Sequence, residues 1–240
     1  MKKILLALFS VGGAFWGYKE FHLSDDKFLY AGTVEATKVT LSSKLMTDII
    51  ALPVEEGDEV KKDEIVAKLN NDIYQVASKQ LNNDYERSLK LLHNGHTSVE
   101  QHDRIEVAKR NNDLHIQWCD IKSPINGTVI AKFKEKGELV SPGTNIISLA
   151  DMDNVWAYFY VEHDLIYKIK IGGSVSCTLL ENPGMKIVGT VVKINEEAEF
   201  TPKNVQTREE RTRLVYGVKV RFNNKNRLLK AGMVLETSFE

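Results

Sequence analysis

The sequence is poor in cysteine and nearly balanced in charge. Two cysteines in 240 residues, Cys119 and Cys177, are too few for a disulfide framework or a cysteine-rich zinc site. We interpret both as free thiols in half-buried positions, with a single bridge between them as the alternative. The formal net charge of −1 at pH 7 gives no basis for a general affinity for nucleic acids or anionic lipids.

The chain also lacks an apolar run of the roughly 20 residues that a membrane-spanning helix needs. The apolar stretch Ile4–Tyr18 is shorter than that and follows two lysines. This pattern is typical of a secretory signal or of an inner-membrane anchor whose N-terminus stays inside. Because the aromatic pair Phe15 and Trp16 suits a membrane interface, we favour an uncleaved anchor at residues 1–20 over a cleaved peptide. The rest of the chain is then expected to lie in the periplasm.

Two segments, 50–69 and 130–149, resemble each other at an offset of 80 residues. Each copy predicts a strand, an acidic turn with glycine, a short strand, a second turn and a strand. Gly57 and Gly137 would supply the positive φ that a tight turn needs. One copy is too short to bury its own apolar face, so the two copies are expected to pack as one small β-sandwich. The identical pairs are Ile50/Ile130, Ala51/Ala131, Glu55/Glu135, Gly57/Gly137, Val60/Val140 and Leu69/Leu149.

This repeat resembles a split lipoyl or biotinyl domain, in particular in the sequences Gly57-Asp58-Glu59-Val60 and Gly137-Glu138-Leu139-Val140. When such domains are carriers, they hold the modified lysine at a hairpin between the two halves. Here residues 70–123 occupy that place, and no such lysine motif is present. The resemblance therefore implies a lipoyl-like fold at residues 35–70 and 122–150, without a carrier lysine and without a cofactor.

The inserted segment, residues 71–121, predicts a helical hairpin because the apolar period changes from 2 to 3.6. Asn71 or Asp72 would cap the first helix, and Asn94-Gly95 would end it. Thr97 and Glu100 form a capping-box pattern for the second helix. The expected apolar stripes are Tyr74, Ala77, Leu81, Tyr85, Leu89 and Leu92 on the first arm, and Ile105, Ala108, Asn112, His115 and Cys119 on the second.

A hairpin inserted in a split lipoyl domain behind an N-terminal anchor resembles the HlyD-like periplasmic adaptors, also called membrane fusion proteins. In that family the hairpin tip carries an arginine, a leucine four residues later and a serine seven residues after that. Arg87, Leu91 and Ser98 have this spacing and lie on both sides of the predicted turn. The resemblance implies that these three residues dock on an outer-membrane channel. The alternative is that Leu91 packs under the turn while Arg87 is solvated and Ser98 only starts a helix.

Histidines near the predicted turn do not indicate a metal site. His93, His96 and His102 lack the spacing and the nearby cysteines or acidic pairs of a zinc site. We interpret them as solvated loop residues, and a pH-dependent contact with a partner is the alternative. No pattern in the chain indicates a catalytic residue, so we do not expect an enzyme.

The C-terminal part, residues 151–240, predicts a small closed β-barrel, to which residues 28–34 add a strand. The expected strands are 154–161, 174–180, 186–194, 213–222 and 233–239, with a helix at 162–169 and turns at 182–184, 223–224 and 231–232. Residues 197–216 are similar to a run in adaptors of ABC-type exporters. The charged residues of this hairpin, which we expect to be solvated with transporter contact as the alternative, are Glu196, Glu197, Glu199, Arg208, Glu209, Glu210, Arg211 and Arg213.

The fold expected from these patterns is mostly β: a split lipoyl-like β-sandwich with an inserted coiled-coil hairpin, plus a small β-barrel. The resemblance implies a periplasmic adaptor, anchored in the inner membrane of a Gram-negative cell, that links an exporter to a TolC-like outer-membrane channel for efflux or secretion. The end of the sequence after the last barrel strand favours an ABC-type transporter. Adaptors of this kind form homo-oligomeric rings, commonly hexamers. The alternatives are a lipoyl or biotinyl carrier domain of a transferase and a periplasmic binding or lipid-transfer module without an outer channel.

Overall fold

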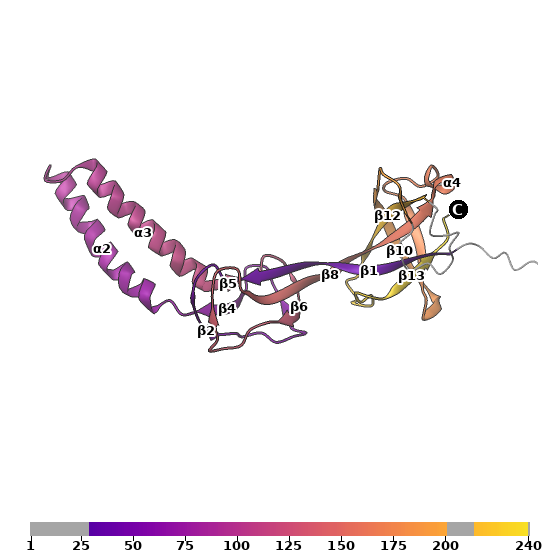
Figure 1. Ribbon diagram of the computed structural model, residues 1–240, viewed down its shortest axis with the longest axis horizontal. Helices are drawn as coiled ribbons and strands as arrows, with labels where there is room; N and C mark the ends of the chain where they lie inside the picture. The colour runs from indigo at the N-terminus through magenta and orange to yellow at the C-terminus, as the bar shows by residue number, and fades with distance from the viewer. Residues whose placement is uncertain (1–28, 201–213, 240) are drawn as a thin grey trace, which may run out of the picture. The chain divides into compact units, whose positions relative to one another are not determined.

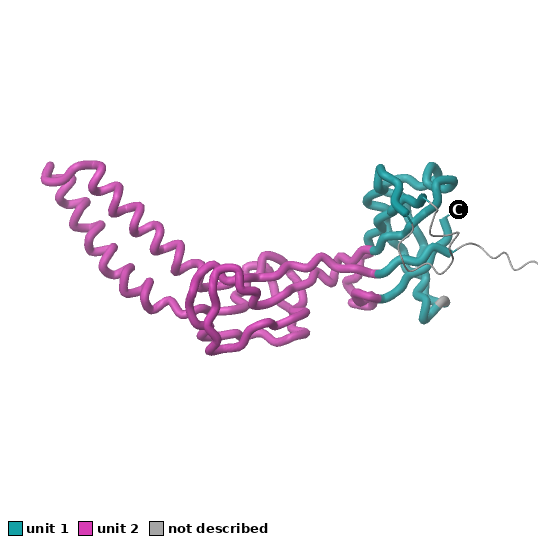
Figure 2. Tube along the Cα trace, viewed as in Figure 1, with its two compact units in different colours: residues 1–33, 157–221, 233–240 teal, residues 34–156, 222–232 magenta. Residues whose placement is uncertain are grey.

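The computed structural model describes residues 29–200 and 214–239 (Figure 1). The chain divides into two compact units, coloured separately in Figure 2. The predicted anchor at residues 1–20 lies outside the described residues, and no helix within the described ranges is long and apolar enough to cross a membrane. We call the units the barrel unit, Met1–Thr33, Ala157–Arg221 and Met233–Glu240, and the sandwich unit, Val34–Trp156 and Phe222–Gly232.

The sandwich unit is built from the two repeated segments. Its strands are β2 (Thr47–Ala51), β3 (Glu59–Val60) and β4 (Ile65–Leu69) from the first copy, β5 (Asp120–Lys122), and β6 (Gly127–Lys132), β7 (Leu139–Val140) and the start of β8 (Asn145–Glu162) from the second. Strands β5, β4, β2 and β7 form a four-stranded sheet, and β6 joins β3 to β8. The two halves therefore fold together across the inserted segment.

The first strand of each copy pairs with the second strand of the other copy. Thr47 lies opposite Val140 where β2 meets β7, and Gly127 lies opposite Val60 where β6 meets β3. Each residue of one pair is 80 positions from its counterpart in the other. Because the copies are offset by 80 residues, the same strand pairing occurs twice between them, once for each copy's first strand.

The turns of both copies use the left-handed conformation that the glycines predict. Gly57 has a φ of +97° and Gly137 a φ of +91°. The second turn also has a positive φ in each copy, at Asp63 (φ +66°) and at Gly143 (φ +87°). Because aspartate tolerates this region better than most side chains, the first copy keeps the turn without a glycine.

One apolar core lies between the two halves of the sandwich unit. It draws on both copies and on the end of the inserted segment, so neither half contains a complete core. Full burial of a branched aliphatic side chain stabilises a fold by roughly 1.5–3 kcal/mol. The buried members are Leu45, Ile49, Val54, Val60, Val66, Ala67, Leu69, Cys119, Val129, Val140, Ile146, Ile147 and Leu149.

The inserted segment is a pair of antiparallel helices, α2 (Asp72–His93) and α3 (Val99–Cys119) (Figure 1). Most of the predicted inward stripe is confirmed, but Leu89 is 47% exposed and Ser88 is buried. Ser88 follows Tyr74 and Leu81 at seven-residue intervals, the repeat that keeps a residue on the seam of two packed helices. On α3, Ala108 is exposed instead of inward, and His102 is buried.

The barrel unit contains a closed ring of strands. The neighbour order is β12, β10, β9, β13, β1 and β8, and an additional pairing of β12 with β8 closes the ring. The predicted closed barrel and the mostly β fold class are therefore confirmed. The remaining elements are β1 (Tyr30–Ser42), α4 (His163–Ile166), β9 (Ser174–Leu179), β10 (Asn182–Ile194), β11 (Glu199–Phe200), β12 (Leu214–Asn223) and β13 (Val234–Thr237).

Three sequence predictions in this part were wrong. The turn predicted at residues 182–184 lies within β10, where the pairing register shifts between Asn182 and Lys186. The helix predicted at 162–169 is limited to α4. Strand β8 continues through the polar run 151–154, because Asp151 accepts hydrogen bonds from the backbone of Asp153 and Asn154 and so satisfies these groups. Part of the charged hairpin predicted near residue 200, residues 201–213, lies outside the described residues.

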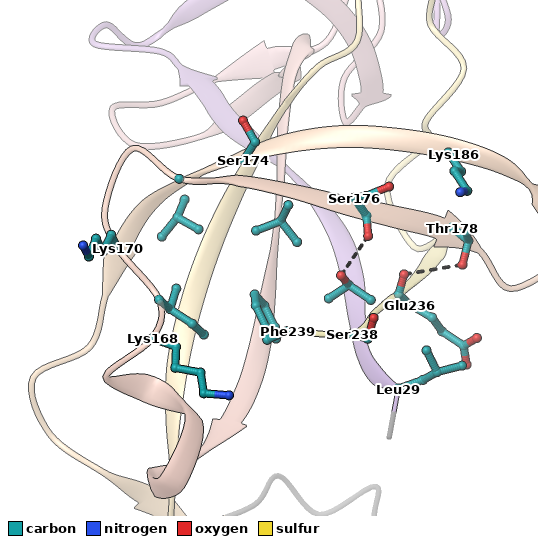
Figure 3. Close-up of a pocket in the computed structure, with 15 residues that line it drawn as sticks. Leu29, Lys168, Lys170, Ser174, Ser176, Thr178, Lys186, Glu236, Ser238 and Phe239 are labelled. Atoms are coloured by element: carbon teal, nitrogen blue, oxygen red, sulfur yellow. Dashed lines mark hydrogen bonds between the residues drawn. The ribbon is translucent and has the colours of Figure 1, made fainter. Parts of the chain in front are cut away.

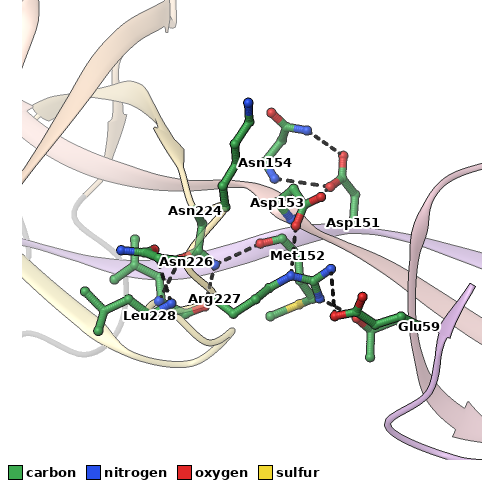
Figure 4. Close-up of polar contacts among 12 residues, drawn as sticks. Glu59, Asp151, Met152, Asp153, Asn154, Asn224, Asn226, Arg227 and Leu228 are labelled. Carbon is green, nitrogen blue, oxygen red and sulfur yellow. Dashed lines mark hydrogen bonds and ion pairs between the residues drawn. The ribbon is translucent and has the colours of Figure 1, made fainter.

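The loop Phe222–Gly232 belongs to the sandwich unit and is fixed there by two polar side chains (Figure 4). The buried Asn224 donates from Nδ2 to the carbonyls of Met152 and Leu229, at 2.8 Å each, and its Oδ1 accepts from the Leu229 N–H. The guanidinium of Arg227 contacts Asp153 at 2.8 Å, Glu59 at 3.3 Å and the Thr128 hydroxyl at 2.6 Å. The sequence predicts this loop as part of the barrel domain, residues 151–240.

Replacing Asp72–Gln117 by a short glycine-rich turn is expected to leave the sandwich unit folded. Lys68 lies opposite Asp120 in the β4–β5 pair, so a tight turn can join the two strands, and the buried core residues stay in place. Circular dichroism should show loss of the helical signal and a retained cooperative urea transition. A noncooperative urea transition would contradict the view that the two halves form one unit.

Candidate docking site at the hairpin tip

The first helix ends in a glycine-dependent cap, as the sequence predicts. Gly95 has a φ of +73°. Its N–H donates to the Leu92 carbonyl at 3.0 Å, and the His96 N–H donates to the Leu91 carbonyl at 2.8 Å. These two bonds form a Schellman motif, which satisfies carbonyls that have no partner within the helix. The backbone around Leu91 is therefore fixed, while its side chain stays 38% exposed.

The second helix is capped by Ser98, not by Thr97 as the sequence predicted. The Ser98 hydroxyl accepts from the Gln101 N–H at 3.2 Å, and Ser98 itself has an extended conformation. Residues 98–101 match the same capping-box pattern as residues 97–100, so the pattern alone could not choose between the two registers. Ser98 therefore has a structural role, whatever it contributes to docking.

Ser98→Ala is expected to destabilise the hairpin by about 1 kcal/mol, the usual cost of losing a serine cap. Thr97→Ala is the matched control and should change stability by much less, because Thr97 is not the cap. Urea unfolding of the full chain, followed by the helical signal, measures both effects. A larger loss for Thr97→Ala would contradict the cap assignment.

The structure brings Arg87 and Leu91 together in a groove between the two helices near the tip. The groove has a volume of about 440 Å³, and Arg87 and Leu91 lie one helical turn apart in its lining. Arg87 is 71% exposed and makes a long ion pair of 3.9 Å with Asp84. Ser98 is not among the lining residues. The groove is lined by Leu81, Asp84, Arg87, Ser88, Leu91, Thr97, Gln101, Arg104, Ile105 and Ala108.

Arg104 is a further candidate residue of this groove, and no pattern in the sequence pointed to it. Arg104 lines the groove from α3 and also pairs with Glu100 at 2.7 Å. The two side chains of this pair are four residues apart on α3. The groove thus has arginine side chains from both helices together with the apolar side chains of Leu91 and Ile105. It can accept an apolar side chain and bind carboxylate or carbonyl oxygens beside it.

His102 is not a solvated residue, which corrects the sequence interpretation. It is 7% exposed, its Nδ1 lies 2.9 Å from the Ser88 hydroxyl, and its ring packs against Tyr85. It lies opposite the small Ser88, where a ring fits. His93 and His96 are exposed, as predicted. The described residues include no cluster of histidine, cysteine, aspartate or glutamate that could hold a metal ion.

Both cysteines are buried free thiols. Burial raises the pKa of Cys177 to about 12, and burial together with the nearby Asp120 also raises the pKa of Cys119. Since the thiolate is the reactive form, neither side chain is poised as a nucleophile. We expect the native chain to react slowly with maleimide near pH 7.5, and the urea-unfolded chain to take up two labels. Rapid native labelling, read by intact mass, would contradict this burial.

Comparisons with known proteins match the sandwich unit to one family. Residues 37–150 match the family described as RND membrane fusion protein, barrel-sandwich hybrid domain. The chain is 37% identical over 111 residues to a UPF0194 membrane protein of Acidithiobacillus ferridurans, covering 46% of this chain and 33% of the relative. It is 28% identical over 126 residues to the UPF0194 membrane protein YbhG of Salmonella gallinarum, covering 52% and 38%. The alignments thus span little more than a third of these curated relatives.

Solved structures share the fold over most of the chain. A MacA–MexA chimeric protein containing the Pseudomonas aeruginosa MexA α-hairpin domain has a TM-score of 0.68 at 19% identity, covering 89% of this chain and 82% of its own. The membrane fusion protein Spr0693 of Streptococcus pneumoniae has a TM-score of 0.61 at 18% identity, covering 89% and 98%. The family match and the shared fold point the same way: residues 37–150 match the barrel-sandwich hybrid domain of the membrane fusion proteins, and the described residues are similar in fold to solved proteins of this kind, the periplasmic adaptors.

Proposed function

We propose that this adaptor links an inner-membrane exporter to a TolC-like outer-membrane channel. It has no catalytic role and acts by mechanical coupling. The exporter is ABC-type, and the chain is held at the inner membrane by residues 1–20 with the remainder facing the periplasm. Several copies, commonly six in adaptors of this kind, form a ring. The observation that carries the proposal is the exposed Leu91 beside Arg87 at the end of a helical hairpin.

In this proposal the hairpin tip docks on helices of the outer channel. Leu91 enters an apolar groove of the channel, and Arg87 donates to carboxylate or carbonyl oxygens next to it. The chemistry of the tip supports this role, because a fixed leucine beside a guanidinium is a common anchor at helical interfaces. Ser98 caps α3 and can still donate its hydroxyl proton to the partner.

The alternative of a lipoyl or biotinyl carrier lacks its acceptor site. In the sandwich unit, the connection between β4 and β5 is the helical hairpin, so no lysine lies at a tight β-turn between the halves. The alternative of a lipid-transfer module predicts that the chain binds a transporter but no outer-membrane channel. The domain boundaries given by the sequence, at residues 20, 35, 71, 122 and 151, remain a prediction.

Crosslinking and purification of the anchored full chain from cells test the proposal. We expect an ABC-type transporter and a TolC-like channel to be recovered together. Recovery of a transporter without any channel, from cells that contain one, would favour the lipid-transfer alternative. A periplasm-dependent reporter fused after Glu240 tests the topology, and an expressed but inactive fusion would contradict periplasmic exposure.

A further inference from the structure

A groove on the barrel unit combines cationic, hydroxyl and apolar side chains (Figure 3). Its volume is about 730 Å³, and it lies along β9 and β13 beside the loop that follows α4. Lys168 and Lys170 come from that loop and Lys186 from β10, and all three are exposed. In the view of Figure 3, Lys186 lies on the opposite side of Phe239 from Lys168 and Lys170. Although the net charge of the whole chain is close to zero, three lysines line this one groove.

Hydrogen-bond donors in this groove are available for an anion. Thr237 donates its hydroxyl to the Ser176 carbonyl at 2.8 Å, so that group is already used. Within residues 29–200 and 214–239, the lining hydroxyls of Ser174 and Ser176 and the three lysine ammonium groups have no hydrogen-bond or ion-pair partner. A phosphate group can accept from a lysine ammonium group and from neighbouring hydroxyls. The carboxylate of Glu236, also in the lining, can accept from a hydroxyl of a larger headgroup.

Exposed apolar side chains lie in and beside the same groove, and a small soluble anion would not contact them. Leu29, which lines the groove, is 52% exposed. In the adjoining loop Tyr167 is 74% exposed and Ile171 is 67% exposed. A loop that alternates aromatic or aliphatic residues with lysines has the composition of segments that lie in a membrane interface. The combination therefore fits an amphiphile with an anionic head.

The position of the groove in the chain fits the same ligand. Leu29 follows the end of the apolar run Ile4–Tyr18 by eleven residues, which can span at most roughly 40 Å. If that run is the anchor, as the proposed function has it, the groove cannot lie far from the bilayer surface. We propose that this groove and the loop Tyr167–Ile171 bind an anionic phospholipid of the membrane in which the chain is anchored.

A fluorescent label on the loop tests this proposal in the full chain. Tyr167→Cys can be labelled selectively with an environment-sensitive dye, because both native cysteines are buried. The labelled chain in neutral detergent micelles is titrated with phosphatidylglycerol or with phosphatidylcholine. We expect a blue shift with phosphatidylglycerol only. Replacing Lys168, Lys170 and Lys186 by glutamine should weaken the response by roughly a hundredfold, given about fivefold for each lysine near an anionic surface.

The matched control removes the same charge elsewhere in the chain. Lys61→Gln, Lys62→Gln and Lys136→Gln change exposed lysines of the sandwich unit and should leave the lipid response unchanged. Equal responses to both lipids, or equal weakening in the control variant, would overturn the proposal. A blue shift with glycerol phosphate alone would make the groove a soluble-anion site instead. Loss of a crosslinked transporter in the groove variant, without any lipid response, would make it a protein interface.

This experiment is separable from the adaptor proposal. The lipid response is measured without a channel or transporter, so it can fail while export and channel crosslinking remain intact. Conversely, the loss of export in hairpin-tip variants does not alter the lipid response. Unfolding transitions of the glutamine variants should match the parent chain, because the replaced side chains are exposed.

Discussion

Leu91→Asp is expected to reduce export to background while leaving the hairpin folded. The substitution places a carboxylate where the proposed interface needs an apolar group, and burying a charge without a partner costs several kcal/mol. A loss of about 3 kcal/mol weakens docking more than a hundredfold. Export of a transported dye or drug in cells that lack the chromosomal copy gives the readout.

The matched control for this substitution is Leu89→Asp on the same helix. Leu89 is 47% exposed, against 38% for Leu91, but it does not line the groove between the helices. We expect it to preserve export, since side chains two residues apart on an α-helix project about 160° apart. Normal export by Leu91→Asp would remove the tip from the docking surface. An unfolded Leu91→Asp chain would show that Leu91 is part of the hairpin core.

The arginine beside Leu91 allows a finer test of the same site. Arg87→Gln removes the charge without creating a like-charge pair with Asp84, which lies 3.9 Å from the guanidinium. Loss of a charged hydrogen-bond partner in an interface costs roughly 2–5 kcal/mol. Arg104→Gln, on the other wall of the groove, tests whether both arginines contact the partner.

Asn224→Ala is expected to cause a large loss of stability, about 3 kcal/mol. Asn224 is 1% exposed, and its side chain makes three hydrogen bonds of 2.8 Å to backbone groups of Met152 and Leu229. Truncation leaves those backbone groups unpaired, at about 1–3 kcal/mol for each buried group before any water enters. Urea unfolding measures the loss.

Asn226→Ala provides the control within the same loop. Asn226 is exposed, and among the described residues its side chain makes one long hydrogen bond, accepting from the Leu228 N–H at 3.5 Å. Its replacement should change the free energy of unfolding by less than about 0.5 kcal/mol. Equal losses for both variants would mean that the loop, and not the Asn224 side chain, determines the effect.

Local sequence patterns predicted most of the architecture because they encode it directly. The repeat at an offset of 80 predicted that the two copies form one sandwich, since neither copy is long enough to bury its own apolar face. The change of apolar period located the hairpin, and Asn94-Gly95 located its turn. Strand β8 was predicted in two pieces, one ending at residue 149 and one at 154–161, whereas in the structure the Asp151 carboxylate accepts from backbone N–H groups of the polar run between them.

The details of the tip depended on contacts between the helices. His102 was predicted to be solvated, and Ser88 is absent from the predicted apolar stripe because it is polar, yet each provides the hydrogen-bond partner that permits the burial of the other. The choice between Thr97 and Ser98 as the cap was ambiguous because both match the pattern. Arg104 became a candidate only when α2 and α3 were seen to share a groove, since no spacing along one helix can show a neighbour on the other.

Site-specific photocrosslinking in cells tests the docking proposal most directly. A photoreactive residue in place of Leu91 should form an adduct with a TolC-like channel, whereas the same residue in place of Val107, which is 58% exposed on α3, should not. An adduct from the tip alone is the result that the account predicts. The absence of a channel adduct at position 91 in an expressed and anchored chain, or equal adducts from both positions, would contradict it.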